Sequence, residues 1–175
     1  MKKTVYLSLG SNIGDREANL RDAIQRLSVV GKVSSVSTFY ETEPMELTRQ
    51  PWFLNCAVEL QTEKMPRQLL AALLRVERAM GRRRSAANEK GPRKIDIDLL
   101  LFGNAIMEMP ELTLPHLALH LRRFVLVPLA EIAAEVVHPV LKRTIRDLRD
   151  SLPSSAGAVR PFMAALKWGG RAANP

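Results

Sequence analysis

Two carboxylates stand two residues apart in Asp96-Ile97-Asp98, within an apolar run from Ile95 to Phe102. In a β-strand, residues i and i+2 project from the same face, so these side chains would originate about 7 Å apart. Two like charges at that distance repel each other unless a cation lies between them. Hard oxygen ligands of this kind suit Mg²⁺, which often bridges to substrate phosphates. The alternative is a solvated edge strand whose acidic residues face outward and pair with nearby arginines.

A basic segment directly precedes these carboxylates. Residues 82–94 contain six basic residues and one acidic residue, a net charge of +5, whereas the whole chain carries +8. Its arginines are Arg82, Arg83, Arg84 and Arg93. Guanidinium groups bind phosphate oxygens bidentately, and arginines gathered with metal-binding carboxylates around a polyphosphate are the working parts of phosphoryl transfer. An arginine-rich loop alone would equally indicate a solvated surface or an RNA contact.

An aromatic ring and an amide share one face of another predicted strand. Phe53 and Asn55 could stack on a flat heterocycle and form hydrogen bonds with its edge. Phe124, which follows two arginines, could supply a second ring on the opposite side of the heterocycle. The alternative is structural: Phe53 would pack under a loop, and Asn55 would satisfy a backbone group.

Two other polar motifs carry weaker signals. His116, His120 and His138 lack the cysteine partners and the regular helix of a zinc site, although His116 could donate a hydrogen bond to a phosphate. Residues 10–14 (Gly-Ser-Asn-Ile-Gly) precede a predicted helix, as a phosphate-binding loop does. They lack the lysine of a Walker loop and the third glycine of a Rossmann turn, so we interpret them as a turn.

Alternation and helical spacing predict the elements that hold these residues. Strands are predicted at 4–9, 33–41, 53–61 and 95–102, and helices at 16–29, 66–80, 124–134 and 145–152. Residues 42–51 contain two prolines and are predicted to form a loop, residues 103–123 a loop with a short helix, and residues 153–161 a linker. The second half of the strand at 95–102 is apolar at every position, as expected of a central strand.

The order of these elements predicts an α+β fold of the ferredoxin-like type. The pattern β-α-β-β-α-β indicates an antiparallel sheet with two helices on one face, followed here by extra C-terminal helices. The aliphatic residues of each strand identify the face toward those two helices. Phe53, Asn55, Asp96 and Asp98 then point toward the other face, which is expected to be open. A ring, an amide and two carboxylates on one open face indicate a binding site.

Length and composition limit the remaining possibilities. The 175 residues are 46% hydrophobic and 25% charged, which describes one globular domain and excludes a disordered chain. We expect a single domain over residues 1–168 and a flexible tail over 169–175. One cysteine, Cys56, permits no internal disulfide, and no apolar run reaches the about 20 residues that cross a bilayer. A cytoplasmic location is therefore expected.

The sequence resembles the 6-hydroxymethyl-7,8-dihydropterin pyrophosphokinase family from about residue 5 to residue 168. Residues 91–100 (GPRKIDIDLL) carry most of the resemblance, and residues 9–12, 39–44, 53–55 and 114–116 support it. The resemblance implies a ferredoxin-like fold and an enzyme of folate biosynthesis. Such an enzyme moves a diphosphoryl group from ATP to the hydroxymethyl group of the pterin and releases AMP. It also implies two Mg²⁺ ions. We expect a monomer with no nucleic-acid or membrane partner.

The same resemblance implies roles for individual residues. Asp96 and Asp98 would hold the two Mg²⁺ ions, and Arg82 and Arg93 would be catalytic. The implied ATP-binding residues are Glu77, Arg84, Leu99, Thr113, His116 and Arg122. The implied pterin-binding residues are Thr42, Pro44, Met45, Phe53, Asn55 and Phe124, with the two phenylalanines stacking on opposite faces of the ring.

Two other functions remain open from the residues alone. RNA-binding modules with a ferredoxin-like fold also present aromatic rings on an open sheet face. The sequence lacks a Lys/Arg-Gly-Phe-type motif on a central strand, however, and outward-facing Asp96 and Asp98 would repel a nucleic-acid backbone. A ligand-binding regulatory domain without catalysis would leave Arg82 and Arg93 unexplained.

Overall fold

The computed structural model describes residues 1–45, 49–82 and 91–162. Arg84 and most of the basic segment, the predicted tail at 169–175 and the predicted domain boundary at 168 lie outside these residues. The elements, in chain order, are β1 (Lys3–Ser11), α1 (Arg16–Leu27), β2 (Lys32–Val36), β3 (Tyr40–Thr42), β4 (Phe53–Thr62), α2 (Pro66–Ala79), β5 (Asp96–Phe102), β6 (Met107–Met109), β7 (Leu112–Leu114), the 3-10 helix η1 (Leu119–Leu121), α3 (Arg123–Ala133), α4 (Ile145–Ser151) and β8 (Val159–Pro161).

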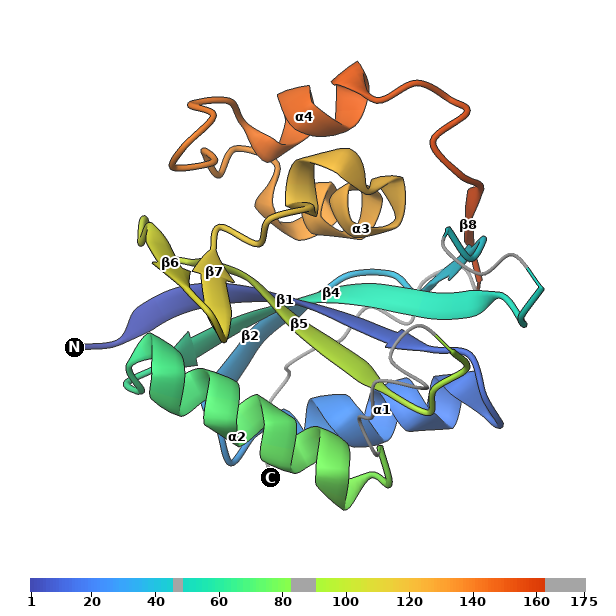
Figure 1. Ribbon diagram of the computed structural model, residues 1–175, viewed down its shortest axis with the longest axis horizontal. Helices are drawn as coiled ribbons and strands as arrows, with labels where there is room; N and C mark the ends of the chain where they lie inside the picture. Colours follow the sequence, from blue (N-terminus) through green and yellow to red (C-terminus); the bar gives the residue numbers. More distant parts are fainter. Residues whose placement is uncertain (46–48, 83–90, 163–175) are drawn as a thin grey trace, which may run out of the picture.

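One antiparallel sheet of six strands runs through the molecule (Figure 1). Its order is β5-β1-β4-β3-β8, and β2 pairs with β4 beside β3. β1 and β4 pair along their whole length, from Lys3 with Thr62 to Ser11 with Leu54. β6 and β7 form a separate hairpin. The predicted antiparallel sheet is therefore confirmed.

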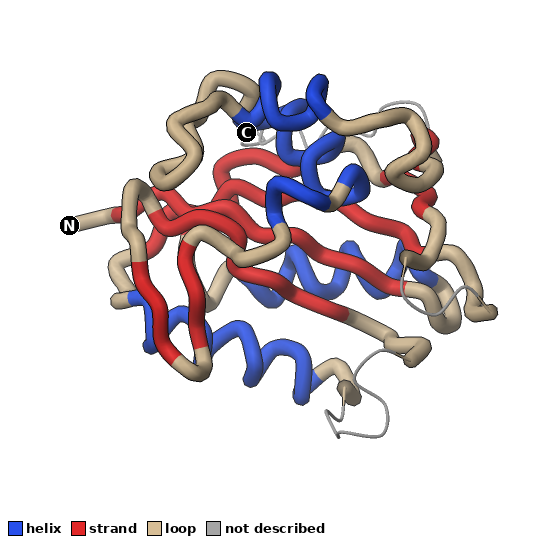
Figure 2. The backbone as a smooth tube through the Cα atoms, turned by 45° about the horizontal axis from the view of Figure 1, so that its top comes forward, coloured by secondary structure: helices blue, strands red, loops and turns tan. Residues whose placement is uncertain are grey.

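Helices cover both faces of the sheet (Figures 1 and 2). α1 and α2 lie on one face, where a buried cluster joins strand residues such as Leu7 and Leu54 to helix residues such as Leu20. α3 and α4 lie on the other face, over a second cluster that includes Ala57 and Leu126. The expectation that this second face is open is thus wrong over most of its area. Two C-terminal helices bury it because its residues there are apolar.

The four α-helices found among the described residues follow their predicted positions because local signals define their ends. Asp15 caps α1, its side chain accepting a hydrogen bond from the backbone N–H of Ala18. Pro66 begins α2, and Gly81 follows it with a φ of 92°, a conformation that favours glycine. Across the described ranges no helix combines the length and the apolar character needed to span a lipid bilayer.

The strand predicted at 33–41 is two strands, β2 and β3. Between them, Ser37 is buried, and its backbone N–H donates to the carbonyl of Ala57 on β4 at 2.9 Å. The Ser37 hydroxyl oxygen accepts a hydrogen bond from the N–H of Ala57 at 2.9 Å. The Ser37 side chain thus takes the place of a backbone carbonyl as the partner of the Ala57 N–H, and this interrupts the ladder of backbone hydrogen bonds along β4. The alternation of residue types did not predict this interruption.

β5 is an edge strand and not the predicted central strand. The second half of β5 is apolar at every position because helices bury both faces of the sheet there and because a β-bulge turns an extra residue toward one of them. The pairing with β1 shifts between Tyr6 and Leu7, so Leu100 and Leu101 both join the second cluster. β6, β7 and β8 were not predicted, because three residues are too few to display a period of two.

Candidate functional site

The register of three neighbouring strands brings the predicted site residues into two adjacent rows. Gly10 on β1 pairs with Asn55 on β4 and with Asp96 on β5. Ser8 pairs with Asp98 on β5 in the next row. Because β1 contributes only a glycine and a serine between the larger side chains, the sheet surface is hollow at this point.

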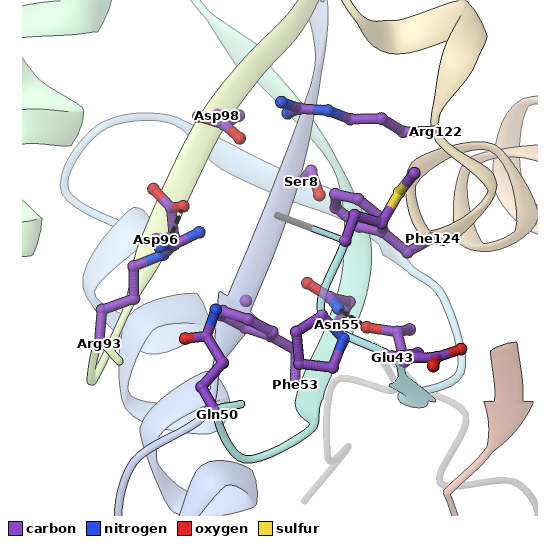
Figure 3. Close-up of a pocket in the computed structure, with 14 residues that line it drawn as sticks. Ser8, Glu43, Gln50, Phe53, Asn55, Arg93, Asp96, Asp98, Arg122 and Phe124 are labelled. Atoms are coloured by element: carbon purple, nitrogen blue, oxygen red, sulfur yellow. Dashed lines mark hydrogen bonds and ion pairs between the residues drawn. The ribbon is translucent and has the colours of Figure 1, made fainter. Parts of the chain in front are cut away.

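This hollow forms a pocket of about 220 Å³ (Figure 3). It is lined by Ser8, Gly10, Thr42, Glu43, Pro44, Met45, Gln50, Phe53, Asn55, Arg93, Asp96, Asp98, Arg122 and Phe124. The lining contains all six residues predicted to bind the pterin, both predicted metal ligands, one predicted catalytic arginine and one predicted ATP contact. The tertiary structure therefore brings together residues as far apart in the chain as Ser8 and Phe124.

The aromatic and amide groups belong to one side of the pocket. Asn55 lies between Phe53 and Phe124 in the view of Figure 3. Asn55 is buried, and its Nδ2 donates a hydrogen bond to Thr42 Oγ1, which orients the amide. A Cβ at Gly10 would lie 2.5 Å from Asn55 Oδ1, so this close approach requires glycine. Two rings and one oriented amide suit a flat ligand with hydrogen-bonding edges.

The carboxylates and arginines form the other side. Asp96 and Asp98 project from the same face of β5, while Ile97 between them is buried in the core, as predicted. Arg93 Nε lies 3.0 Å from Asp96 Oδ2, and the Arg93 guanidinium lies 4.9 Å from the centre of the Phe53 ring. Arg93 thus touches both the acidic and the aromatic part of the pocket.

Arg82 and Glu77 lie behind the carboxylates and do not line the pocket. The Arg82 side chain is 7% exposed and forms ion pairs with Asp96 and with Glu77, the latter at 3.0 Å. Glu77 is buried, and its carboxylate also accepts a hydrogen bond from the backbone N–H of Ile97 at 2.7 Å. Since Ile97 stands between the two aspartates, this buried pair supports the backbone that carries them.

His116 lies within electrostatic range of Arg122 and Asp96. Burial lowers the pKa of His116, the positive charge of Arg122 lowers it further, and the negative charge of Asp96 opposes both effects. His116 Nδ1 accepts a hydrogen bond from the backbone N–H of Ala118 at 3.2 Å. These contacts favour a neutral imidazole with its proton on Nε2, which is a hydrogen-bond donor.

Other predicted ATP contacts lie away from the pocket. Leu99 is buried in the core cluster beneath the sheet, and Thr113 is half-buried on β7. Neither lines the pocket, and their predicted roles stay predictions. Arg84 lies outside the residues that the structure describes.

Sequence reasoning missed three lining residues, Ser8, Gly10 and Gln50; Glu43 was predicted only through the backbone of residues 42–45. Ser8 and Gly10 carried a usable signal, because they interrupt an aliphatic strand at alternate positions and so mark a face without bulky side chains. Gln50 belongs to a loop whose path no periodicity predicts.

Comparison with known proteins identifies relatives over most of the chain. The family model described as 7,8-dihydro-6-hydroxymethylpterin-pyrophosphokinase (HPPK) matches residues 6–134. A protein of Aquifex aeolicus named 2-amino-4-hydroxy-6-hydroxymethyldihydropteridine pyrophosphokinase is 34% identical over 164 residues, covering 94% of this chain and 98% of that protein. The protein of the same name from Bacillus subtilis is 43% identical over 138 residues, covering 78% of this chain and 81% of that protein.

Longer relatives contain a similar segment. The Folic acid synthesis protein fol1 of Schizosaccharomyces pombe is 41% identical over 154 residues, which is 87% of this chain. The chain spans only 21% of that protein and 18% of the protein of the same name from Pneumocystis carinii.

Solved structures share the fold. A crystal structure of HPPK-DHPS in complex with substrates matches with a TM-score of 0.68 at 16% identity, covering 86% of this chain and 43% of that chain. A Plasmodium falciparum HPPK-DHPS structure matches with a TM-score of 0.69 at 17% identity, covering 86% of this chain and 45% of that chain.

Proposed function

The chain belongs to the 7,8-dihydro-6-hydroxymethylpterin-pyrophosphokinase family, and on that premise we propose that it transfers a diphosphoryl group from ATP to 6-hydroxymethyl-7,8-dihydropterin. The hydroxymethyl oxygen of the pterin forms a bond to the β-phosphorus of ATP. The bond between that phosphorus and the oxygen bridging to the α-phosphate breaks, AMP leaves, and the hydroxyl proton is released to solvent. The product enters folate biosynthesis.

One observation carries this proposal: a single pocket joins an aromatic and amide half to a carboxylate and arginine half. Phe53 and Phe124 would stack on the two faces of the pterin. Asn55 would form hydrogen bonds with its edge, aided by the backbone of residues 42–45. Holding both reactants in one pocket converts a bimolecular reaction into an effectively unimolecular one, which supplies a large part of the rate enhancement.

The arginine half would bind the phosphates of ATP. Arg93 and Arg122 line the pocket and would bind phosphate oxygens, and His116 would donate from Nε2. Arg82 would act from behind, through its ion pair with Asp96. We retain Arg84, Glu77, Leu99 and Thr113 as ATP contacts on the strength of the family resemblance alone.

Asp96 and Asp98 have the chemistry of a magnesium site. Both present hard carboxylate oxygens to the pocket. Among the residues that the structure describes, no group of three or more His, Cys, Asp or Glu could hold a metal ion. Mg²⁺ accepts such a sparse set, because one or two carboxylates, water and substrate phosphates complete its coordination. We propose two ions; when bound, they would neutralise phosphate charge and acidify the attacking hydroxyl group.

The ferredoxin-like assignment is also part of the proposal. With β2 and β3 taken as one interrupted strand, the order β5-β1-β4-β2/β3 follows the pattern of a split β-α-β pair. β6, β7 and β8 are additions to it. A cytoplasmic location, a monomeric state and the single domain over 1–168 stay predictions from the sequence.

The alternative of an RNA-binding module gains no support. The family match is to an enzyme, and two carboxylates line the pocket where an RNA backbone would have to lie.

The direct test is to incubate the protein with ATP, Mg²⁺ and 6-hydroxymethyl-7,8-dihydropterin and to measure AMP. We expect AMP and the pterin diphosphate to appear in equal amounts. A reaction without pterin controls for ATP hydrolysis, and omission of Mg²⁺ tests the metal requirement separately. Absence of AMP from the complete mixture, with folded protein, would refute the proposed activity.

A further inference from the structure

Asn12 belongs to the turn at 10–14, which the sequence analysis singled out without giving it a function. Asn12 is only 2% exposed and does not line the pocket. A buried amide must satisfy its hydrogen-bonding groups within the protein. The partners of Asn12 are therefore informative.

Asn12 bridges two segments that are distant in the chain. Its Nδ2 donates to Gln50 Oε1 at 3.0 Å and to the carbonyl oxygen of Pro51 at 3.1 Å. Its Oδ1 accepts a hydrogen bond from the backbone N–H of Arg93 at 2.8 Å, and its own N–H donates to the carbonyl of Arg93 at 3.1 Å. One side chain thus uses both amide protons on the loop before β4 and its oxygen on the segment before β5.

The two bridged segments carry opposite halves of the pocket. Gln50 lines the pocket and lies three positions before Phe53, the first residue of β4. Arg93 lines the carboxylate half and contacts both Asp96 and the Phe53 ring. The hydrogen bonds of Asn12 therefore connect one segment of each half.

The turn itself is held by hydrogen bonds from α1. Asn19 on α1 is buried, and its Nδ2 donates to Ser11 Oγ at 3.1 Å and to the carbonyl of Ile13 at 2.8 Å. Both residues flank Asn12. The residues on either side of Asn12 are thus tied to α1 by hydrogen bonds, which is the kind of support that a positioning group requires.

We propose that Asn12 is a positioning residue that holds Gln50 and Arg93 in register across the pocket. The inference rests on the proposed function, because it assigns Gln50 to the pterin side and Arg93 to the phosphate side. A misplacement of about 1 Å between reacting groups can lower a rate by about 100-fold. Only an amide serves here, since the site needs two donors on one side and an acceptor on the other.

Two substitutions distinguish the hydrogen bonds to residues 50 and 51 from the hydrogen bond to Arg93. Asn12→Ala removes all three side-chain hydrogen bonds, whereas Asn12→Asp keeps an acceptor for the Arg93 N–H and loses both donors to residues 50 and 51. The control is Thr62→Val at the far end of the β1–β4 pair. Thr62 is 2% exposed, and its hydroxyl also bridges two segments, donating to the carbonyl of Val30 and accepting from the N–H of Lys64.

The kinetic measurement is kcat/KM for the pterin, taken with the melting temperature of each variant. We expect Asn12→Ala to lower kcat/KM by about 10- to 100-fold. Thr62→Val should lose similar thermal stability and keep kcat/KM near the wild-type value. Equal kcat/KM in Asn12→Ala and Thr62→Val, at equal loss of stability, would overturn the proposal.

A second measurement does not depend on turnover. Hydrogen–deuterium exchange should rise in peptides covering 49–53 and 91–96 of Asn12→Ala, and in 49–53 alone of Asn12→Asp. If the wild type releases no AMP but these exchange changes appear, the proposed activity fails while the bridge stands. Faster exchange confined to residues 10–14 would refute the bridge whatever the activity.

Discussion

Replacing Gly10 by alanine adds one methyl group to the floor of the pocket. An ideal Cβ there would lie 2.5 Å from Asn55 Oδ1 and 3.6 Å from Phe53 Cδ1. Gly10 is not one of the glycines with positive φ, so alanine suits its backbone conformation. The effect of the substitution should therefore come from the contact with Asn55 and not from backbone strain.

The geometry gives the size of the effect. Ordinary contact begins at 3.4 Å, so the Asn55 amide must retreat by about 0.9 Å, the difference from 2.5 Å. Asn55 is 4% exposed and donates to Thr42 Oγ1, so it cannot turn into water without losing that bond. Displaced by that distance, the amide no longer reaches the edge of the bound pterin, and a buried polar group left unsatisfied in the complex costs about 1–3 kcal/mol, which corresponds to about 5- to 140-fold in the pterin Kd.

The assay is calorimetric titration of the pterin in the presence of a non-hydrolysable ATP analogue. We expect Gly10→Ala to raise the pterin Kd by about 5- to 140-fold, with the affinity for the ATP analogue near the wild-type value. The melting temperature of each variant controls for unfolding. Neither aspartate is among the atoms nearest to the added methyl, which is why the phosphate side should be spared.

A double-mutant cycle decides whether the methyl group acts through the amide. Asn55→Ala removes the clashing oxygen, so adding Gly10→Ala to that variant should weaken pterin binding little further. If Gly10→Ala weakens binding equally in both backgrounds, or leaves the wild-type affinity unchanged, the reasoning about this close approach is refuted.

Three further predictions concern separate parts of the protein. Asp98→Asn should lower kcat by at least about 100-fold, since it removes one of two carboxylates for Mg²⁺; near-normal turnover would contradict the metal assignment. Phe124→Ala should weaken pterin binding by about 10-fold or more, as expected for a lost stacking ring, and ATP binding far less; equal losses would contradict the stacking role. Burial and neighbouring His120 lower the pKa of His138, whose Nδ1 accepts hydrogen bonds from two backbone N–H groups. Below about pH 6.5, His138 therefore takes up a proton more readily in the unfolded chain than in the native state. The free energy of unfolding that is present above that pH is lost as the pH falls. The melting temperature between pH 7.5 and 5 should fall more steeply in the wild type than in His138→Asn; parallel curves would contradict this.

The buried pair of Arg82 and Glu77 illustrates what residue types alone could not predict. Both residues were singled out from the sequence resemblance, and their roles stay predictions; the sequence does not specify which groups their charges meet. In the fold, Glu77 satisfies an edge-strand N–H at Ile97 and Arg82 satisfies Glu77 and Asp96. These contacts depend on how the end of α2 lies against the edge of the sheet, and that placement is not a local property.

Local patterns were enough for the main elements and for the chemistry of the site. Helix positions followed from spacing and caps, and the shared face of Asp96 and Asp98 followed from strand geometry alone. Side-chain type likewise predicted that Phe53 and Asn55 bind a flat ligand; the structure places both residues at the pocket, and the ligand stays a prediction. The helix positions and the shared strand face were predictable because each depends on residues that are within a few positions of one another.

Tertiary structure decided where the site is hollow and what holds its two halves together. The pocket exists because the strand register sets Gly10 between Asn55 and Asp96, and register depends on pairings across more than 40 residues of chain. The same is true of Asn12, whose partners at 50, 51 and 93 are remote in sequence. The sequence by itself determined which chemical groups are available. Long-range packing determined the distances between those groups, because the whole core sets the packing and no single segment does.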